Sequence, residues 1–153
     1  MAKRCRRNPV GVRVLFPLDG SERGFASMEA ALDLLKGTTV QATLLVVLHD
    51  FKGAPEEMVQ EFEEDTEDEI FPTEDSAVVV LKQATKRLRR KGVEMTLKMS
   101  KGNIVKEIIA ESANHDLLVI HSPRASKRFR LRSGRTRKIV RGSVCNVLLM
   151  QNY

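Results

Sequence analysis

LLVIHSPRASKRFRLRSGRTRKIVRGSVCNVLLM, residues 117–150, is the stretch that decides the fold of this chain. It opens with the apolar run at residues 117–120, which predicts a strand buried on both faces, and closes with a second apolar run at residues 147–150. Between them, residues 124–141 hold nine Lys or Arg residues in eighteen and no acid. An all-cationic piece between two buried strands predicts a place where an anion binds.

Outward from this stretch, predicted strands and helices alternate along the chain. Further strands are predicted over residues 10–18, 41–48 and 93–99, and the strict apolar and polar alternation of the third is typical of a half-exposed edge. Helices are predicted between Ser21 and Gly37, from Ala77 to a stop at Gly92, after the cap at Asn103, and around residues 136–141. This order predicts an α/β fold with a doubly wound, five-stranded parallel sheet, because each parallel return needs a crossover of this length.

Length and charge indicate one domain with two charged extensions. The chain has 153 residues, 42% of them hydrophobic, which suffices for one buried core and is short for two. We therefore expect a single domain over residues 10–153, preceded by a basic arm over residues 1–9. The net charge of +6 hides an acidic excursion expected at residues 51–74, because residues 56–75 carry eleven acids and no base. Such a charge dipole favours oriented association with a partner or another copy.

Several classes of function find no support in the sequence. No apolar run reaches the roughly eighteen residues of a membrane span, and the basic arm lacks the apolar part of a signal peptide, so we expect a soluble, cytoplasmic protein without membrane contact. The three histidines and two cysteines lack metal-ligand spacing. No P-loop, serine-hydrolase or zinc-protease motif occurs. We therefore expect no metal site, no catalytic residue and no enzyme.

Polar residues follow two of the predicted strands, at the edge where a doubly wound sheet binds its ligands. Asp19-Gly20-Ser21 follows the first strand, and residues 121–124 follow the fourth. If these strands are neighbours, Asp19 faces the start of the basic stretch, where a carboxylate can accept hydrogen bonds from ribose and cations can hold phosphate. Two alternatives stay open, with Asp19 as a turn residue that caps the next helix and His121 as a side chain that fills a pocket.

Short motifs between residues 12 and 150 resemble those of the universal stress protein family. Residues 16–21 (FPLDGS) are similar to its VPxDGS strand end, residues 44–47 (LLVV) to its second strand, and residues 116–120 (DLLVI) with Ser122 to its DLIVMGS strand. Gly102-Asn103 before residues 107–109 (EII), and residues 145–149 (CNVLL), which are similar to CPVLVV, extend the match. The resemblance implies a Rossmann-like three-layer sandwich of the adenine-nucleotide α-hydrolase type, with strand order 3-2-1-4-5.

The resemblance also implies a site for ATP or another adenine nucleotide, with an altered phosphate loop. Family members that bind ATP have a G-x-x-G pattern, then nine residues, then Gly with Ser or Thr; here those four positions are His121, Arg124, Gly134 and Arg135. Side chains at glycine positions occupy the space where phosphate meets backbone amides, so we expect nucleotide binding that is weak, altered or lost. The implied nucleotide-binding residues are Asp19, Val47, His121, Ser122, Arg124, Gly134 and Arg135.

Two functions of different classes follow, with a third possibility for self-association. The first is a regulatory stress-response module that dimerises, as the resemblance implies, through its last strand at Val147, Leu148, Leu149 and Met150; Leu148 and Met150 are expected to need cover on a free edge. The second is a binder of nucleic acid or another phosphate-rich partner through residues 124–141, with candidate anion contacts at Lys127, Arg128, Arg130 and Arg132. In the third, the acidic excursion associates with the basic loop of a neighbouring copy.

Overall fold

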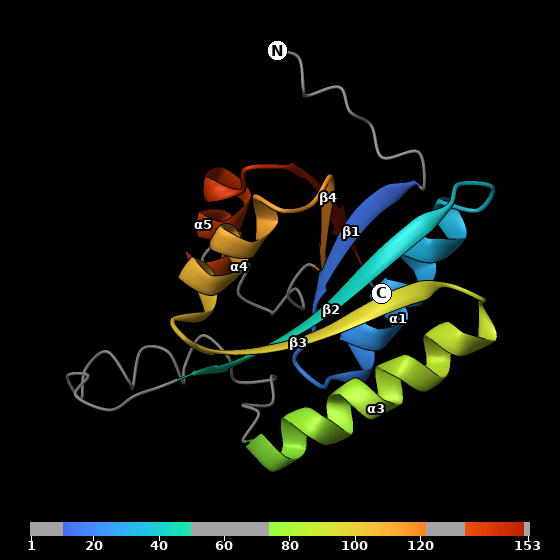
Figure 1. Ribbon diagram of the computed structural model, residues 1–153. Coiled ribbons are helices and arrows are strands. Elements are labelled where there is room, and N and C mark those ends of the chain that lie inside the picture. The colour runs from blue at the N-terminus through green and yellow to red at the C-terminus, as the bar shows by residue number, and fades with distance from the viewer. Residues whose placement is uncertain (1–10, 50–73, 122–133, 152–153) are drawn as a thin grey trace.

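A five-stranded parallel sheet forms the centre of the protein, in the order β3-β2-β1-β4-β5 (Figure 1). The computed structural model describes residues 11–49, 74–121 and 134–151. In these residues the strands are β1 (Val12–Pro17), β2 (Val40–His49), β3 (Glu94–Gly102), β4 (Leu117–His121) and β5 (Asn146–Met150). The predicted doubly wound fold and its strand order are therefore confirmed.

Helices cover both faces of the sheet, and each face has its own apolar core (Figure 1). The four described helices are α1 (Glu22–Leu34), α3 (Glu74–Arg90), α4 (Ile104–Ser112) and α5 (Gly134–Gly142). Residues of α1 and α3 pack against the sheet to form the larger core, and Phe16 and Leu44 are among its most buried residues. Residues of α4 and α5 bury a smaller core on the opposite face, around Leu118.

Local chemistry places the helix ends as the sequence predicts. The side chains of Ser21 and Asn103 cap α1 and α4, each accepting a hydrogen bond from the backbone N–H three residues on. Gly37 and Gly92 end the turns after α1 and α3 with φ of 91° and 68°, a left-handed conformation that costs glycine little. These caps fix where each helix begins and so where each strand's carboxyl end opens.

Strands β1 and β4 lie side by side, which is the point where the winding of the sheet reverses. Arg13 of β1 reinforces this pairing, because its backbone N donates to Asp116 Oδ2 at 2.9 Å and its Nη2 lies 3.1 Å from Asp116 Oδ1. The guanidinium hydrogen bond lowers the pKa of Asp116 below its ordinary value. These contacts hold the amino ends of β1 and β4 together, and the parallel pairing brings the carboxyl ends of both strands to the same edge of the sheet.

The two edge strands differ in how they match expectation. Strand β3 is half exposed, as its alternation predicts, and even its apolar residues Leu97 and Met99 are partly open. On β5, the expectation that Leu148 and Met150 lie uncovered is wrong, because both pack against the larger core and Leu149 is the exposed member at 41%. Side chains alternate along a strand, so the face that α1 covers takes Leu148 and Met150 and leaves Leu149 outside.

Two predicted features fall outside the described residues. The first is the basic arm over residues 1–9. The second is the acidic excursion over residues 51–74, of which the structure describes only Glu74, the first residue of α3. Among the helices of the described ranges, none combines the length and the apolar composition that crossing a membrane requires.

Candidate functional site

The structure brings Asp19 and His121 together across the β1–β4 switch point. Asp19 follows β1 by two residues, and His121 is the last residue of β4. Nε2 of His121 lies 3.4 Å from Oδ2 of Asp19, and both side chains are largely buried, with 17% and 21% of their surfaces exposed. The expectation that these two strands are neighbours is thus confirmed, while the start of the basic stretch at Arg124 lies outside the described residues.

The carboxylate of Asp19 is held ionised by the groups around it. Its Oδ1 accepts hydrogen bonds from the backbone N of Ser21 at 2.9 Å and from Ser21 Oγ at 2.6 Å. Burial alone would raise its pKa, but the hydrogen bonds from His121 and Ser21 outweigh burial and lower the pKa to about 2. Asp19 is therefore both a turn residue that orders the start of α1 and a buried anion at the switch point.

Two glycines shape the backbone next to this carboxylate. Gly20 has φ of 89°, which a side chain rarely adopts, so it allows the sharp turn from β1 into α1. A Cβ at Gly24 would lie 3.0 Å from Asp19 Oδ1 and 3.2 Å from Ser21 Oγ. Gly24 therefore leaves room for the Asp19–Ser21 hydrogen bond. Sequence reasoning did not assign Gly24 to the site, although a glycine inside a helical pattern was a usable signal.

Val47 lies near the carboxyl end of β2, on the face that α4 and α5 cover, and is 5% exposed. Its partner across the β2–β3 ladder is Ser100. The hydroxyl of Ser100 is buried and has no hydrogen-bond partner among the described residues. A buried hydroxyl without a partner is costly, which makes Ser100 a polar group near Val47 that the sequence did not single out.

The described part of the basic stretch is α5. Arg135 lies at its first turn beside the half-buried Gly134, and exposed cations follow along the helix at Arg137, Lys138 and Arg141. An added Cβ at Gly134 would meet no atom within 4 Å. The third glycine of the family pattern is therefore not required by the packing around it. At the far end of α5, Gly142 allows close contact with Ile109 of α4, where a Cβ would collide.

The remaining predicted site residues lie outside the described residues. They are Ser122, Arg124, Lys127, Arg128, Arg130 and Arg132. Of the residues that the family pattern implies, the structure thus places Asp19, Val47, His121, Gly134 and Arg135. It shows a direct contact between Asp19 and His121.

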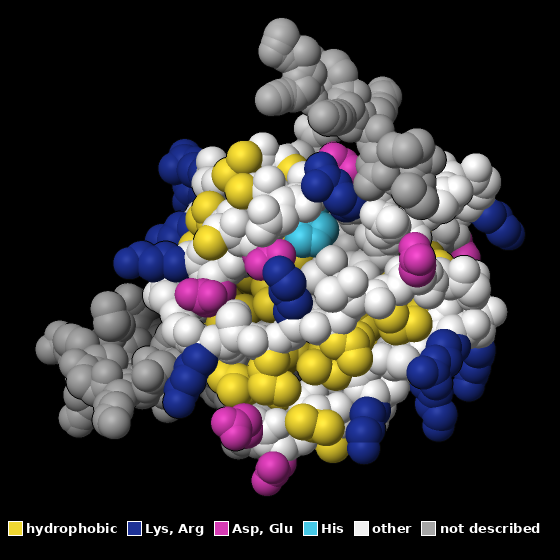
Figure 2. All heavy atoms as spheres, in the orientation of Figure 1, with side chains coloured by type: hydrophobic (Ala, Val, Ile, Leu, Met, Phe, Trp, Pro, Cys, Tyr) yellow, Lys and Arg dark blue, Asp and Glu magenta, His cyan; other side chains and the backbone are white. Residues whose placement is uncertain are grey.

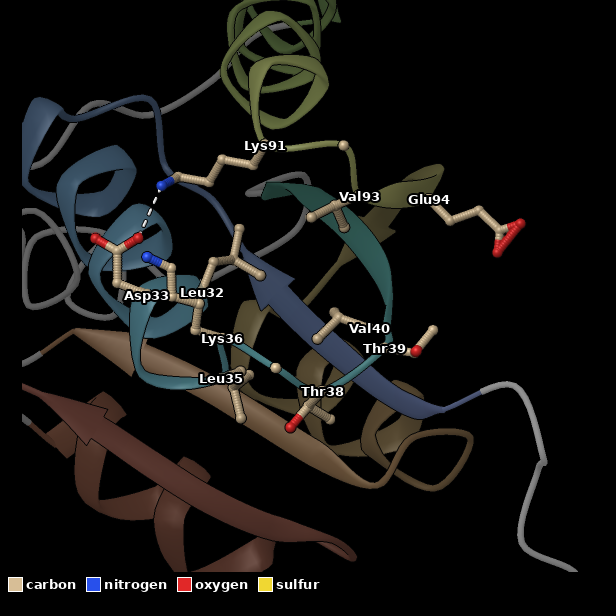
Figure 3. A pocket seen from close by; sticks show the side chains of 12 residues that line it. Leu32, Asp33, Leu35, Lys36, Thr38, Thr39, Val40, Lys91, Val93 and Glu94 are labelled. Atoms are coloured by element: carbon tan, nitrogen blue, oxygen red, sulfur yellow. Dashed lines mark hydrogen bonds and ion pairs between the residues drawn. The ribbon is translucent and has the colours of Figure 1, made fainter.

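A surface hollow of about 750 Å³ lies at the opposite end of the sheet (Figure 3). Its walls are the turn from α1 into β2, with Gly37 and Thr38, and the turn from α3 into β3, with Gly92. An ion pair of 2.9 Å between Lys91 Nζ and Asp33 Oδ1 crosses one side of it (Figure 3). This hollow is formed at the amino ends of β2 and β3, so it is separate from the Asp19–His121 site.

The chemistry open to this site is limited by its hydrogen bonds. Ser21 Oγ donates to Asp19 and not to His121, so the imidazole does not act as a base on this hydroxyl as it would in a serine hydrolase. Within residues 11–49, 74–121 and 134–151, no three His, Cys, Asp or Glu side chains are grouped to hold a metal ion. What the arrangement offers is a largely buried carboxylate with an imidazole beside it.

Comparison with known proteins gives one family and several similar structures. The model of the universal stress protein family matches residues 12–151. No curated protein matches the chain by sequence. The hypothetical protein MJ0577 is 18% identical, with a TM-score of 0.70 over 94% of this chain and 98% of that one.

Two further structures carry nucleotides. A universal stress family protein from Arabidopsis thaliana with AMP bound is 15% identical, with a TM-score of 0.67 over 93% of this chain and 92% of that one. A universal stress protein in complex with cAMP is 16% identical, with a TM-score of 0.61 over 93% and 98%. At these identities the likeness establishes the fold, and function has to be argued from the site.

Proposed function

Since the chain belongs to the universal stress protein family, we propose that it is a regulatory, stress-response module that binds an adenine nucleotide at the Asp19–His121 site with an altered phosphate end. The observation that carries this proposal is the ionised carboxylate of Asp19, held at the β1–β4 switch point. Two similar structures contain AMP and cAMP, which indicates the ligand class to test.

At the ribose end, Asp19 offers one oxygen to a ligand. Its Oδ1 is taken by Ser21, and its Oδ2 faces His121. A ribose hydroxyl that donates to Oδ2 has to share it with the imidazole or displace it. Because displacing a hydrogen bond to a charged group costs about 1.5–3 kcal/mol, this competition accounts for weak binding. Val47 supplies an apolar contact for the base on the neighbouring strand.

At the phosphate end, side chains replace the usual glycines. His121 stands where the family pattern has its first glycine, so the backbone there is shielded by an imidazole. Phosphate would instead meet cations, with Arg135 in the first turn of α5 as the described example. Guanidinium groups bind phosphate through paired hydrogen bonds, so the charge balance of the site still favours an anion.

We propose binding without turnover. The imidazole of His121 pairs with a carboxylate whose other oxygen is already bonded, and Ser21 is committed to that same carboxylate. Ser21 and His121 therefore do not form a pair in which the imidazole takes a proton from the hydroxyl and makes it a nucleophile. Regulation by a bound nucleotide needs only the difference in stability between bound and free states.

Thermal unfolding with ATP, ADP, AMP and cAMP tests the proposal. At a nucleotide concentration of about 100 times Kd, stabilisation is about 2.7 kcal/mol, which raises Tm by roughly 5–10 °C for a chain of this size. We expect a shift with at least one nucleotide, lost in Asp19→Ala. The matched control is Asp33→Ala, an exposed carboxylate at the opposite end of the sheet, which should keep the shift. Absence of a shift with all four nucleotides would overturn the nucleotide proposal.

A second candidate function is binding of nucleic acid or another phosphate-rich partner through residues 124–141. It is favoured by the three exposed cations of α5 and by the lack of any acid in this stretch. Affinity for a single strand should then fall with a slope of log K against log salt of about −0.7 for each phosphate contact. An affinity that does not change with salt would remove this function. Charge reversal at Arg137, Lys138 and Arg141 should reduce both affinity and slope.

A further inference from the structure

The face between β3 and α3 carries an apolar band that no described element covers. Val78 of α3 and Leu97 and Met99 of β3 expose 44%, 49% and 39% of their surfaces. Figure 2 shows apolar side chains gathered in one band on this side of the molecule, with Lys, Arg, Asp and Glu side chains at its margins. Scattered exposed apolar residues are ordinary, but neighbours that form one band mark an interaction surface.

The geometry of both elements places these side chains on one face. Met95 of β3 packs against the larger core beneath α3, so alternation directs Leu97, Met99 and Lys101 to the same side of the sheet. Lys98 points to the other side, where it bonds Glu111 of α4 at 2.8 Å.

One flank of helix α3 lies next to this band. On its inner flank, Arg87 bonds Glu22 and Glu29 of α1, so that flank faces α1. Val78, Lys82 and Arg89 follow one another at helical spacing on the opposite flank. That flank lies beside β3, because α3 packs on both β2 and β3.

Strand β3 also offers an open backbone edge. It stands at the end of the described sheet and is hydrogen-bonded to β2 alone. With nine residues it is long enough to pair with an added strand. A partner segment can therefore gain main-chain hydrogen bonds from β3 and bury side chains in the apolar band.

The charges around the band select the partner. Lys82, Arg89 and Lys101 border it, and none of the three has an ion pair with another described residue. The acids on the same flank are Glu74 and Asp75, one turn before Val78. A second copy of the chain would bring the same cations face to face, which disfavours β3 pairing with itself.

We propose that the β3–α3 face docks an acidic segment of another protein, with apolar side chains that enter the band and a backbone that pairs with β3. Glutamate or aspartate residues of the segment face Lys82, Arg89 and Lys101. This surface lies on the side of the sheet that α1 and α3 cover, opposite α4 and α5.

Fluorescence anisotropy with a labelled twelve-residue peptide tests the proposal. The probe alternates glutamate with leucine and valine, and a second probe has lysine in place of glutamate. We expect the acidic probe to bind the full chain and the lysine probe to bind at least about tenfold more weakly, because like charges meet the same cations. The double variant Lys82→Glu/Lys101→Glu should reverse that preference. Lys36→Glu, an exposed site at the α1–β2 turn, is the matched control and should change nothing.

The apolar part is tested by Leu97→Thr with Met99→Thr, which keeps strand-forming side chains on β3. We expect about tenfold weaker binding of the acidic probe, equal to about 1.4 kcal/mol, with Tm measured to show that the variant is folded. Equal binding of both probes, or no binding, would overturn the proposal.

Two other occupants give distinct outcomes. Residues 56–69 of this chain carry nine acids and apolar residues of their own. If the probe binds only after these acids are replaced by their amides, the chain's own segment is the occupant and a separate partner is excluded. If light scattering instead shows a dimer that the Leu97→Thr/Met99→Thr variant loses, the occupant is a second copy, and the proposal is equally overturned.

Discussion

Asp19 links the stability of the fold to the chemistry of the candidate site. Its carboxylate stays ionised although it is largely buried, because Ser21 and His121 both donate to it. The same hydrogen bonds that order the turn into α1 therefore maintain a negative charge where β1 and β4 meet.

Acid unfolding should reveal this charge. The pKa of Asp19 in the folded chain is about 2, below its ordinary value of 3.8. The stabilisation is therefore complete above the unfolded pKa and is lost as pH falls from about 4 to about 2. Urea unfolding at several pH values should show on the order of 2 kcal/mol less pH-dependent loss in Asp19→Asn than in the wild type. Equal pH dependence in both proteins would contradict the assigned hydrogen bonds.

The control for that measurement is Asp33→Asn. Lys91 lowers the pKa of Asp33 as well, but this ion pair is exposed to solvent. Its effect should weaken in about 1 M salt, where the Debye length falls to roughly 3 Å. The effect of Asp19 should persist, because the carboxylate is mostly shielded from solvent.

His121→Gly should strengthen nucleotide binding. The substitution frees Oδ2 of Asp19 and restores the first glycine position of the family pattern. We expect AMP to bind about tenfold more tightly, equal to about 1.4 kcal/mol, by isothermal titration calorimetry. The double variant Asp19→Ala/His121→Gly should lose the gain. Unchanged or weaker binding in the single variant would indicate that the imidazole contributes to the site instead of obstructing it.

At the scale of elements, one buried serine ties α4 to the start of β5. Ser112 is fully buried; its Oγ donates to Ile109 O at 2.7 Å and accepts from the backbone N of Val144 at 2.9 Å. Ser112→Ala leaves that N–H without its partner, so we expect a loss of about 1–3 kcal/mol in the free energy of unfolding. Thr38→Ala, at an exposed turn position, should change it by less than about 0.5 kcal/mol. Chemical denaturation of both variants gives the comparison.

A second buried polar link joins β2 to the turn before β4. His115 Nε2 lies 2.8 Å from Thr43 Oγ1, and its Nδ1 lies 2.9 Å from Glu111 O. Both ring nitrogens are thus satisfied within the core, which assigns His115 a structural role. The three histidines of the chain therefore differ, and His121 is the one placed at the switch point.

At the scale of the whole molecule, we propose that the dimer predicted from the sequence forms through β5. Leu149 on this edge strand exposes 41% of its surface, and Val144, two residues before β5 begins, exposes 68%. Leu149→Glu should convert a dimer into a monomer, because a charge at the centre of a paired edge is left without a partner. Light scattering at micromolar concentration measures the change. Leu34→Glu is the matched control on α1, where a leucine is 67% exposed, and should leave the mass unchanged. A wild type that is monomeric would contradict the proposed dimer.

The order of the strands and helices was predictable because each apolar run is long enough to predict a strand from its own residues. Residues 117–120 lie in β4 and residues 147–150 lie in β5, as predicted. The run in β4 is apolar because that strand is covered on both faces of the sheet, whereas β5 is an edge strand. Two helices begin after the predicted caps, Ser21 and Asn103, and two are followed by the predicted left-handed glycines, Gly37 and Gly92. These positions were predictable because caps and left-handed turns depend on neighbouring residues only.

The candidate site was predictable in part. The sequence indicated that Asp19 and His121 follow strands, and the fold confirms that these strands are neighbours. It did not indicate that Gly24 makes room for the Asp19 carboxylate, or that the hydroxyl of Ser100 is buried opposite Val47. Those relations join residues on different elements, and no local pattern records the distance between them.

The stretch from residue 117 to residue 150 by itself determined two strands, the helix between them and the excess of positive charge, because periodicity and composition are properties of the chain alone. Only the tertiary structure decided that His121 contacts Asp19, that Leu149 and not Leu148 faces outward, and that Val78, Leu97 and Met99 form one surface. Each of these depends on how elements pack across the sheet. Packing joins residues far apart in the chain, so it is settled only when the whole fold has formed.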